Sequence, residues 1–222
     1  MNTSKNKPFD SFKKNIYSQN GEDGVLSEIL KRLSLNTKNH LCVEFGAWDG
    51  KHLSNTFNLV KLGWDAIYIE GDPVKFKDLI DTANEYPKIK AINCQVESDP
   101  DSEASLNSIL LRNNVDSNFD LLSIDVDSFD LDIWESLSNF QPKIVVIEIN
   151  SSVPPGVLQR HSFNRQGNSF SSTLEVAKVK GYSLVCHTGN LIFVKNSYVT
   201  KLFVHERFFL YPELLFDDGW LK

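Results

Sequence analysis

The chain has 222 residues, of which 41% are hydrophobic and 23% are charged, and its formal net charge at pH 7 is −6. This length and composition are typical of one globular domain with a full core. With 23 basic against 29 acidic residues and no long run of Lys and Arg, the sequence disfavours a nucleic-acid partner. No segment approaches roughly 18 consecutive apolar residues and the N-terminus lacks an apolar signal-like core, so we expect a cytoplasmic protein without a membrane span.

The three cysteines predict buried thiols rather than a redox or metal site. Cys42, Cys94 and Cys186 all fall within apolar runs that are predicted to be strands. Their number is odd and no C-x-x-C pair is present, so a disulfide framework is not indicated. We therefore expect small core residues in a reducing compartment.

The N-terminal part, residues 1–39, is expected to be a polar arm and a helix, followed by a main unit that spans residues 40–222. Apolar side chains recur at helical spacing on one face of this helix: Val25, Leu26, Ile29, Leu30 and Leu33. One interpretation of the polar residues just before the helix is capping, with Asn20 or Asp23 as the cap. The alternative, a lid over the cofactor, is implied by a resemblance given below. The two parts together are expected to form a single globular domain.

Two apolar runs, residues 41–45 and 66–70, predict neighbouring parallel strands that each carry an acidic residue near the end. Residues 54–63 between them are predicted to be a helix that ends at a glycine. Ligands of such sheets bind beyond the carboxyl ends of the strands, where glycines allow tight turns and a carboxylate can accept hydrogen bonds from both ribose hydroxyls. The candidate cofactor-binding residues at these two strand ends are Glu44, Gly46, Ala47, Asp49, Gly50, Glu70 and Gly71.

The loop after the first strand matches neither a dinucleotide nor a phosphate-binding motif. G-x-G-x-x-G and G-K-[ST] are both absent at this point of the sequence. Asp49 stands where a third glycine would be expected, and an acid there suits a cationic ligand better than a pyrophosphate. S-adenosylmethionine, which carries a sulfonium and an amino group, is such a ligand.

The rest of the chain continues to alternate between helices and strands. The predicted elements are helix 73–85, strand 88–93, strand 121–124 with a helix after it, strand 143–149, helix 169–180, and a hairpin of 182–187 with 191–195. His187 is expected to end a strand without a further role. This order predicts an α/β, doubly wound, Rossmann-like fold with a mostly parallel seven-stranded sheet and a C-terminal antiparallel hairpin.

Three acidic residues, Asp125, Asp127 and Asp130, follow the fourth predicted strand. Asp127, Ser128 or Asp130 is expected to cap the next helix. Three neighbouring carboxylates repel one another, and a bound cation would relieve that repulsion. Asp125 and Asp127 are the candidate catalytic acids.

Glu148 and Asn150 end the fifth predicted strand, at the same sheet edge as Asp125. The three side chains form an all-oxygen set that suits a hard cation such as Mg²⁺ or Mn²⁺. The match to a metal set is inexact, because Ile149 separates Glu148 from Asn150. The competing hypothesis is that these side chains hydrogen-bond the cofactor or the acceptor, with Asp125 as a cofactor ligand.

The longest segment without periodicity, residues 151–168, is a loop of a length that is usually functional or disordered. His161 is a candidate general base, because an imidazole is matched to removing a proton from a hydroxyl near neutral pH. A solvated loop histidine is the alternative. Arg160 and Arg165 are candidates to bind a phosphate or carboxylate of the acceptor, such as a nucleotide-sugar diphosphate.

Four motifs occur in order along the chain: VEFGAWDG, YIEGDP, SIDVDSFDLDIW and VVIEIN. They resemble the class I S-adenosylmethionine-dependent methyltransferases, in particular the FkbM-like branch found among bacterial polysaccharide and natural-product genes. The resemblance extends from about residue 17 to about residue 194, although the glycine-rich loop of the class is reduced here to Gly46, Ala47 and Gly50. It implies S-adenosylmethionine as cofactor and methyl transfer to a hydroxyl of a sugar or sugar-like acceptor, free or nucleotide-linked.

The resemblance also implies further site residues. In the FkbM-like group the stretch YSQNGED corresponds to a lid, which places Gln19 and Glu22 over the cofactor. The third strand of such enzymes ends beside the adenine, so Gln95, Val96 and Glu97 are candidates for the rim of that pocket. The acids of strands four and five are similar to the metal site of metal-dependent O-methyltransferases, and the aromatic tail would cover the acceptor pocket or a homo-oligomer surface.

Two other functions compete with methyl transfer. A non-catalytic Rossmann-like module would use the acidic sheet edge for protein association. A nucleotide-sugar or NAD-binding enzyme is disfavoured by the missing G-x-G-x-x-G motif. Binding of S-adenosylhomocysteine would separate these possibilities.

Overall fold

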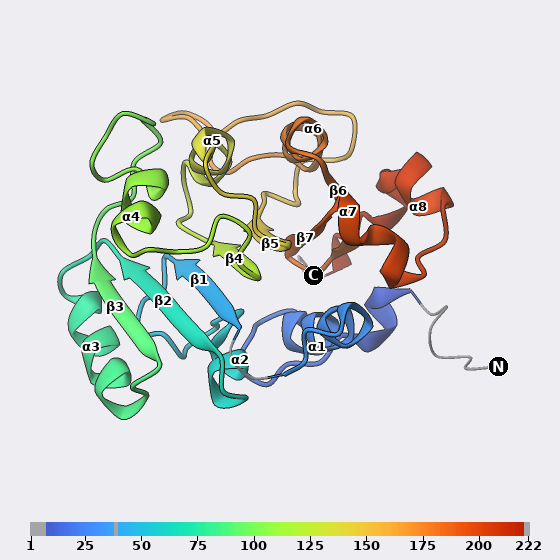
Figure 1. Cartoon of the computed structure of the whole chain (residues 1–222). Helices are drawn as coiled ribbons and strands as arrows, with labels where there is room; N and C mark the ends of the chain where they lie inside the picture. Colours follow the sequence, from blue (N-terminus) through green and yellow to red (C-terminus); the bar gives the residue numbers. More distant parts are fainter. Residues whose placement is uncertain (1–7, 38–39, 220–222) are drawn as a thin grey trace.

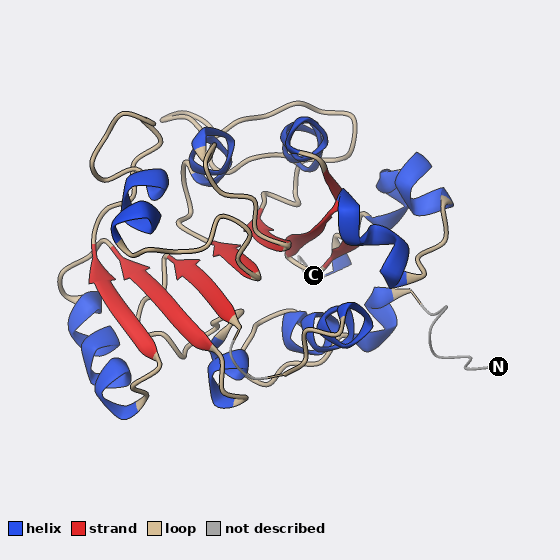
Figure 2. Cartoon of the chain, in the orientation of Figure 1, coloured by secondary structure: helices blue, strands red, loops and turns tan. Residues whose placement is uncertain are grey.

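The computed structural model describes residues 8–37 and 40–219 of the chain. Seven strands form one sheet in the order β3-β2-β1-β4-β5-β7-β6 (Figures 1 and 2). Strands β1 to β5 are parallel, and β7 is antiparallel to both β5 and β6. The strands are β1 Leu41–Phe45, β2 Asp65–Glu70, β3 Ile89–Asn93, β4 Leu121–Ile124, β5 Ile144–Glu148, β6 Tyr182–His187 and β7 Asn190–Lys195. This doubly wound sheet with its C-terminal hairpin confirms the predicted fold class.

Helices cover both faces of the sheet. Figure 1 shows α1, α2 and α3 on one face and α4, α5 and α6 on the other, with α7 and α8 beside the β6–β7 hairpin. The helices are α1 Glu22–Leu33, α2 Phe57–Lys61, α3 Lys75–Glu85, α4 Leu106–Arg112, α5 Asp130–Ser136, α6 Phe170–Lys180, α7 Asn196–Val199 and α8 Arg207–Leu210. Within residues 8–37 and 40–219, no helix is long and apolar enough to cross a membrane.

Alternate side chains of the strands enter two hydrophobic cores. In β1, Cys42 packs in the core under α1 to α3, whereas Val43 and Phe45 pack in the core under α4 to α6. Each core holds a fully buried tryptophan, Trp64 in the first and Trp134 in the second. Since a buried large side chain contributes roughly 1.5–3 kcal/mol, the two cores strongly favour one strand register. That register brings the polar strand ends to a single edge.

The strands begin and end within one residue of the predicted limits, but three helix starts differ. α3 begins at Lys75, two residues after the predicted start. α2 is shorter than the predicted helix 54–63, because Ser54 and Thr56 hydrogen-bond the buried carboxylate of Glu44. The predicted cap of α1 is wrong. Gly21 occupies the N-cap position with a φ of 102°, and no side chain caps the helix.

The cysteine prediction holds for two of the three residues. Cys42 and Cys186 are buried in β1 and β6, and burial raises the pKa of the Cys186 thiol to about 12. Cys94 instead follows β3 and is partly exposed. In the part of the chain that the structure describes, all three are free thiols.

Candidate functional site

The carboxyl ends of β1 to β5 surround a cavity of about 380 Å³, at the edge where parallel α/β sheets bind ligands. Most candidate cofactor residues line it: Gln19, Glu44, Gly46, Ala47, Glu70, Gly71, Gln95, Val96 and Asp125. Asp127 and Glu148 also line it. The structure therefore brings together side chains from the lid segment and from five strand ends.

Gly46 allows β1 and β4 to approach each other closely. Its φ is 77°, and a Cβ on this residue would lie 1.6 Å from the carbonyl oxygen of Asp125. The amides of Gly46 and Ala47 donate to the carbonyl of Ile69, at 3.1 and 3.2 Å, which holds the turn against β2. Gly71 is less constrained, since a Cβ there would lie 2.3 Å from Oε1 of Gln95, the end of a side chain that can move. The left-handed backbone and the close backbone contact require glycine at Gly46.

The carboxylate of Glu70 is fixed at the wall of the cavity. Its Oε2 accepts from the amide of Trp48 and its Oε1 from the amide of Asp72, each at 2.8 Å. The residue is 7% exposed. Each oxygen keeps a second lone pair, so the carboxylate can accept two further donors in a set orientation. This geometry suits the two hydroxyls of a ribose.

Four residues that were predicted to be at the cofactor do not line the cavity: Glu22, Asp49, Gly50 and Glu97. Asp49 turns back on its own loop, where its Oδ1 accepts from the amides of Lys51 and His52 at 2.8 and 2.7 Å. Gly50 instead lies against Leu79 and Tyr68, which a Cβ would meet at 2.8 and 3.0 Å. Glu97 accepts from Ser102 Oγ at 2.5 Å in the loop beyond β3.

Glu44 lines the cavity, but its carboxylate is bonded to the protein. Its Oε2 accepts from Ser54 Oγ at 2.9 Å, from the amide of Thr56 at 3.1 Å and from the Thr56 hydroxyl. Burial raises the pKa of this carboxyl, and the hydrogen bonds from Thr56 and Ser54 oppose that effect. Glu44 therefore shapes the loop after β1 more directly than it can contact a ligand.

The sequence prediction missed Trp48 and Lys75, which both line the cavity. Trp48 has a φ of 47° and is 44% exposed, and Lys75 Nζ lies 4.8 Å from the centre of its ring. An exposed aromatic ring at a cofactor cavity can stack against a flat ligand group. The position of a tryptophan inside VEFGAWDG was the available signal, but its orientation depends on the left-handed backbone.

The carboxylates of Asp125, Asp127 and Glu148 converge, with one oxygen from each lying within 4.8 Å of the others. Burial, followed by the charge of Glu148, raises the pKa of Asp125 to about 9. Burial, followed by the charge of Asp127, raises the pKa of Glu148 to about 7. Three full negative charges are thus unfavourable here, and either a shared proton or a cation would relieve the repulsion.

The predicted metal set of Asp125, Glu148 and Asn150 needs correction. The Asn150 Oδ1 accepts from the amide and hydroxyl of Ser152, and its Nδ2 donates to the carbonyl of Gln166 at 3.0 Å. Because β5 ends at Glu148, Asn150 lies in the following loop, where Ser152 and Gln166 engage its side chain. Asp127 is the third acid of the converging group. Asn150 instead lines a second pocket of about 210 Å³, which shares Asp127 and Glu148 with the main cavity.

Asp130 organises the loop that carries Asp127. Its carboxylate accepts from the amides of Val126 and Ser128 at 2.7 and 2.9 Å, and the residue is 3% exposed. The expected side-chain cap of α5 is therefore wrong, since no side chain caps this helix. Asp130 instead holds the turn in which Asp127 has a φ of 57°.

The long loop does not bring its basic residues to the cavity. The His161 Nδ1 accepts from the amide of Gly167 at 3.2 Å, and its ring packs against Phe129. Arg160 pairs with Asp132 and Glu135, at 3.1 and 2.7 Å. Arg165 is exposed, and none of the three lines either pocket among the residues that the structure describes. The general base and anion-binding expectations therefore find no support in this geometry.

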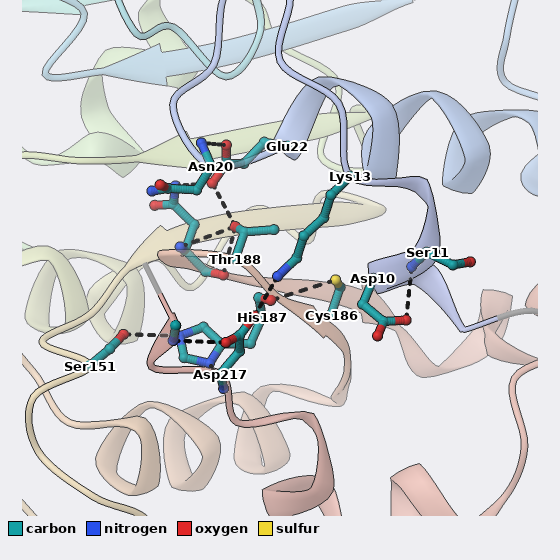
Figure 3. Close-up of polar contacts among 12 residues, drawn as sticks. Asp10, Ser11, Lys13, Asn20, Glu22, Ser151, Cys186, His187, Thr188 and Asp217 are labelled. Carbon is teal, nitrogen blue, oxygen red and sulfur yellow. Dashed lines mark hydrogen bonds and ion pairs between the residues drawn. The ribbon is translucent and has the colours of Figure 1, made fainter. Parts of the chain in front are cut away.

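His187 has a structural role that the sequence did not predict. It is 2% exposed, its Nδ1 accepts from the amide of Asp217 at 2.8 Å, and its Nε2 lies 2.9 Å from Ser151 Oγ (Figure 3). Burial lowers its pKa to about 4. Because Nδ1 is an acceptor, the neutral ring carries its proton on Nε2 and cannot take one from Ser151. The hydrogen bond from Asp217 ties the tail to β6, and the Ser–His contact is not a hydrolase triad.

Comparisons with known proteins agree on the fold. No family model and no curated protein matches the sequence. The CurJ carbon methyltransferase matches with a TM-score of 0.52 and 9% identity, over 81% of this chain and 56% of that chain. TrmK of M. capricolum, in complex with S-adenosyl-homocysteine, matches with a TM-score of 0.47 and 12% identity, over 81% of this chain and 75% of that chain. Precorrin-6y C5,15-methyltransferase from Geobacter metallireducens matches with a TM-score of 0.47 and 11% identity, over 83% of this chain and 92% of that chain.

These identities are low, so the likeness establishes an architecture and not an activity. The chain spans less than two thirds of several of the structures that it matches. Together with the strand order, the match to CurJ shows the Rossmann-like fold of the class I S-adenosylmethionine-dependent methyltransferases.

Proposed function

We propose that this protein is an S-adenosylmethionine-dependent methyltransferase that acts on a hydroxyl of a small, sugar-like molecule. The observation that carries the proposal is Glu70, whose two oxygens are held by backbone amides at the wall of a 380 Å³ cavity. The cavity fits the cofactor by its donor and acceptor chemistry. Glu70 would accept from the ribose hydroxyls, while Gln95, Val96 and the Trp48 ring offer surfaces for the adenine.

The acceptor assignment follows from the second pocket. Its described lining is acidic, polar and apolar and includes no Lys, Arg or His: Asp127, Asp130, Glu148, Ile149, Asn150, Gln166 and Gly167. Carboxylates accept hydrogen bonds from the hydroxyls of a polyhydroxylated molecule, and amides both donate to them and accept from them. The carboxylates also repel a phosphate. An uncharged sugar-like acceptor is therefore favoured, and the diphosphate of a nucleotide-linked sugar would have to lie outside this pocket. The motifs shared with the FkbM-like branch support the same choice.

The acceptor oxygen would attack the methyl carbon while the bond from carbon to sulfur breaks and the electron pair remains on sulfur. S-adenosylmethionine supplies the electrophilic methyl when it is bound. The residues of this chain contribute alignment, since an in-line displacement depends on the geometry of its partners. The hydroxyl proton would pass to the Asp125–Glu148 pair, which faces both pockets through Glu148.

A divalent cation is the rival occupant of the acidic cluster. Mg²⁺ or Mn²⁺ bound by Asp125, Asp127 and Glu148 would orient and acidify the acceptor hydroxyl. We adopt the shared proton as the proposal, and the response of methyl transfer to chelation distinguishes it from a bound cation.

Calorimetry with S-adenosylhomocysteine tests the proposed function. We expect a saturable isotherm with one site per chain. Absence of binding by the folded protein would overturn the methyltransferase proposal and favour a non-catalytic association module on the same fold.

A further inference from the structure

Glu22 is a fully buried acid, with 0% exposure, three residues after the exposed Gln19 of the lid segment. Its Oε1 accepts from the Thr188 hydroxyl at 2.5 Å and from Asn190 Nδ2 at 3.1 Å. Its Oε2 accepts from the amide of Asn20 at 2.8 Å. Figure 3 shows the Glu22 carboxylate between Asn20 and Thr188. The lid is thus joined to the β6–β7 turn, which is distant in sequence.

The same contacts fix the peptide that follows Gln19. The carbonyl of this peptide accepts from Asn15 Nδ2 at 2.7 Å, and its N–H is the one that donates to Glu22. Both ends of the Gln19–Asn20 peptide plane are therefore held. The Gln19 side chain itself has no hydrogen-bond partner among the described residues, and it lines the main cavity.

Asp23 completes the support of this loop. Its Oδ2 accepts from three consecutive amides, those of Ile16, Tyr17 and Ser18, at 2.7 to 2.8 Å. The neighbouring carboxylates of Glu22 and Asp23 thus fix the segment before α1 by accepting hydrogen bonds from its amides. Charge-assisted hydrogen bonds of this kind are about twice as strong as neutral ones, so the loop is held firmly.

The other end of the Glu22 contact lies beside the acidic cluster. Asn190 is the direct partner of Glu148 in the antiparallel pairing of β5 and β7. Glu22 is therefore linked, through Asn190, to the strand position opposite Glu148, which supplies one carboxylate of the acidic cluster. Among the described residues, no basic side chain pairs with Glu22, so burial of its carboxylate is costly. The hydrogen bonds from Asn20, Thr188 and Asn190 offset that cost.

We propose that Glu22 is a positioning residue, which holds Gln19 over the cofactor by tying the lid to the strand beside Glu148. This inference rests on the proposed function, and it differs from the lid prediction in one respect. Glu22 does not line the cavity and acts through Gln19 and not by contact with the cofactor.

The test combines Glu22→Gln, Gln19→Ala and the double variant, with S-adenosylhomocysteine affinity measured by calorimetry. Each single change should weaken binding about tenfold. The double variant should bind no more weakly than the single variant with the larger loss, because both changes act through the same contact. Glu28→Gln is the matched control: Glu28 is a buried acid of the same helix that pairs with Arg32. It should bind as the wild type does.

Amide hydrogen exchange provides a readout that does not need the cofactor. In Glu22→Gln the Asn20 amide should exchange at least tenfold faster, and in Glu28→Gln it should not change. Thr188→Val, which removes a donor to Glu22 and keeps the side-chain shape, should reproduce both effects more weakly if Glu22→Gln does not fold. Additive losses with Gln19→Ala, or unchanged affinity in Glu22→Gln, would overturn the positioning role. Absence of binding by the wild type would overturn the proposed function, and this inference with it.

Discussion

The carbonyl oxygen of Asp125 occupies the place where a side chain on Gly46 would begin. A Cβ built on Gly46 would lie 1.6 Å from that oxygen, and the φ of 77° is one that side chains rarely adopt. β1 and β4 pair as neighbours up to Phe45 and Ile124, the residues just before these two. The turn that opens the cavity and the first carboxylate of the acidic cluster thus depend on one contact.

Replacement of Gly46 by alanine should therefore be severe. We expect Gly46→Ala to lower the free energy of unfolding by more than about 3 kcal/mol, because backbone must move and the left-handed conformation is strained. Gly156→Ala is the matched control, since its φ is 88° but a Cβ there would meet nothing within 4 Å. It should cost only about 1 kcal/mol. If urea unfolding gave the same loss of unfolding free energy for both variants, the backbone around Gly46 would accommodate a Cβ and the prediction would be wrong.

Glu70 should control cofactor affinity. Glu70→Gln keeps the size of the side chain but places an amide NH₂ against a backbone donor or a ribose hydroxyl. Hydrogen bonds to a charged group contribute roughly 1.5–3 kcal/mol, so S-adenosylhomocysteine should bind at least tenfold more weakly.

The control for this loss is Asp116→Asn. Asp116 also holds a backbone amide, that of Asn118 at 2.7 Å, but it lines only a pocket at the opposite end of the strands. Its replacement should leave affinity unchanged. If calorimetry of folded Glu70→Gln gave the wild-type dissociation constant, Glu70 would not be a cofactor ligand.

The sequence was sufficient for features that short-range patterns encode. Both strand faces are buried, so β1, β2, β4 and β5 appear as apolar runs, and the acids at their ends mark the sheet edge. Gly46 and Glu70 follow from that logic, because a parallel sheet gathers its strand ends whatever the intervening loops do. Asn150 lies beyond the end of β5, and its loop contacts with Ser152 and Gln166 were not predictable from the strand pattern.

The remaining features depend on contacts between distant segments. Two of the three hydrogen-bond partners of Glu22, Thr188 and Asn190, are 166 and 168 residues away, and no local signal connects them to Glu22. Arg160 was predicted to bind an anion because the sequence of its loop does not reveal its partner acids, Asp132 and Glu135, which lie in α5. His187 was considered idle because the tail residue that binds it, Asp217, carries no strand or helix pattern.

His187 should make stability depend on pH. Its pKa falls from 6.5 when unfolded to about 4 when folded, because burial disfavours the charged ring. Between these values the unfolded chain binds the extra proton, so stability is full above pH 6.5 and is lost as pH falls towards 4. The loss should reach roughly 3 kcal/mol at most.

Urea unfolding at pH 7.5 and pH 5 measures this effect. In His187→Gln, which cannot titrate, the difference between the two pH values should shrink relative to the wild type. His205→Gln changes an exposed histidine of the tail and should keep the wild-type difference. Identical pH differences in all three proteins would mean that His187 is not buried as a neutral ring.

The acidic cluster should act through a proton and not through a metal. If the Asp125–Glu148 pair accepts the hydroxyl proton, methyl transfer should continue in EDTA, and the rate should rise with pH through about 7, where Glu148 ionises. Glu148→Gln should remove that ionisation from the rate profile and lower turnover by at least a hundredfold. His161→Gln should leave the profile intact, because the His161 ring does not line either pocket. Loss of turnover in EDTA with recovery in Mg²⁺ or Mn²⁺ would instead assign Asp125, Asp127 and Glu148 to a cation, since chelation cannot affect a proton held between two carboxyls.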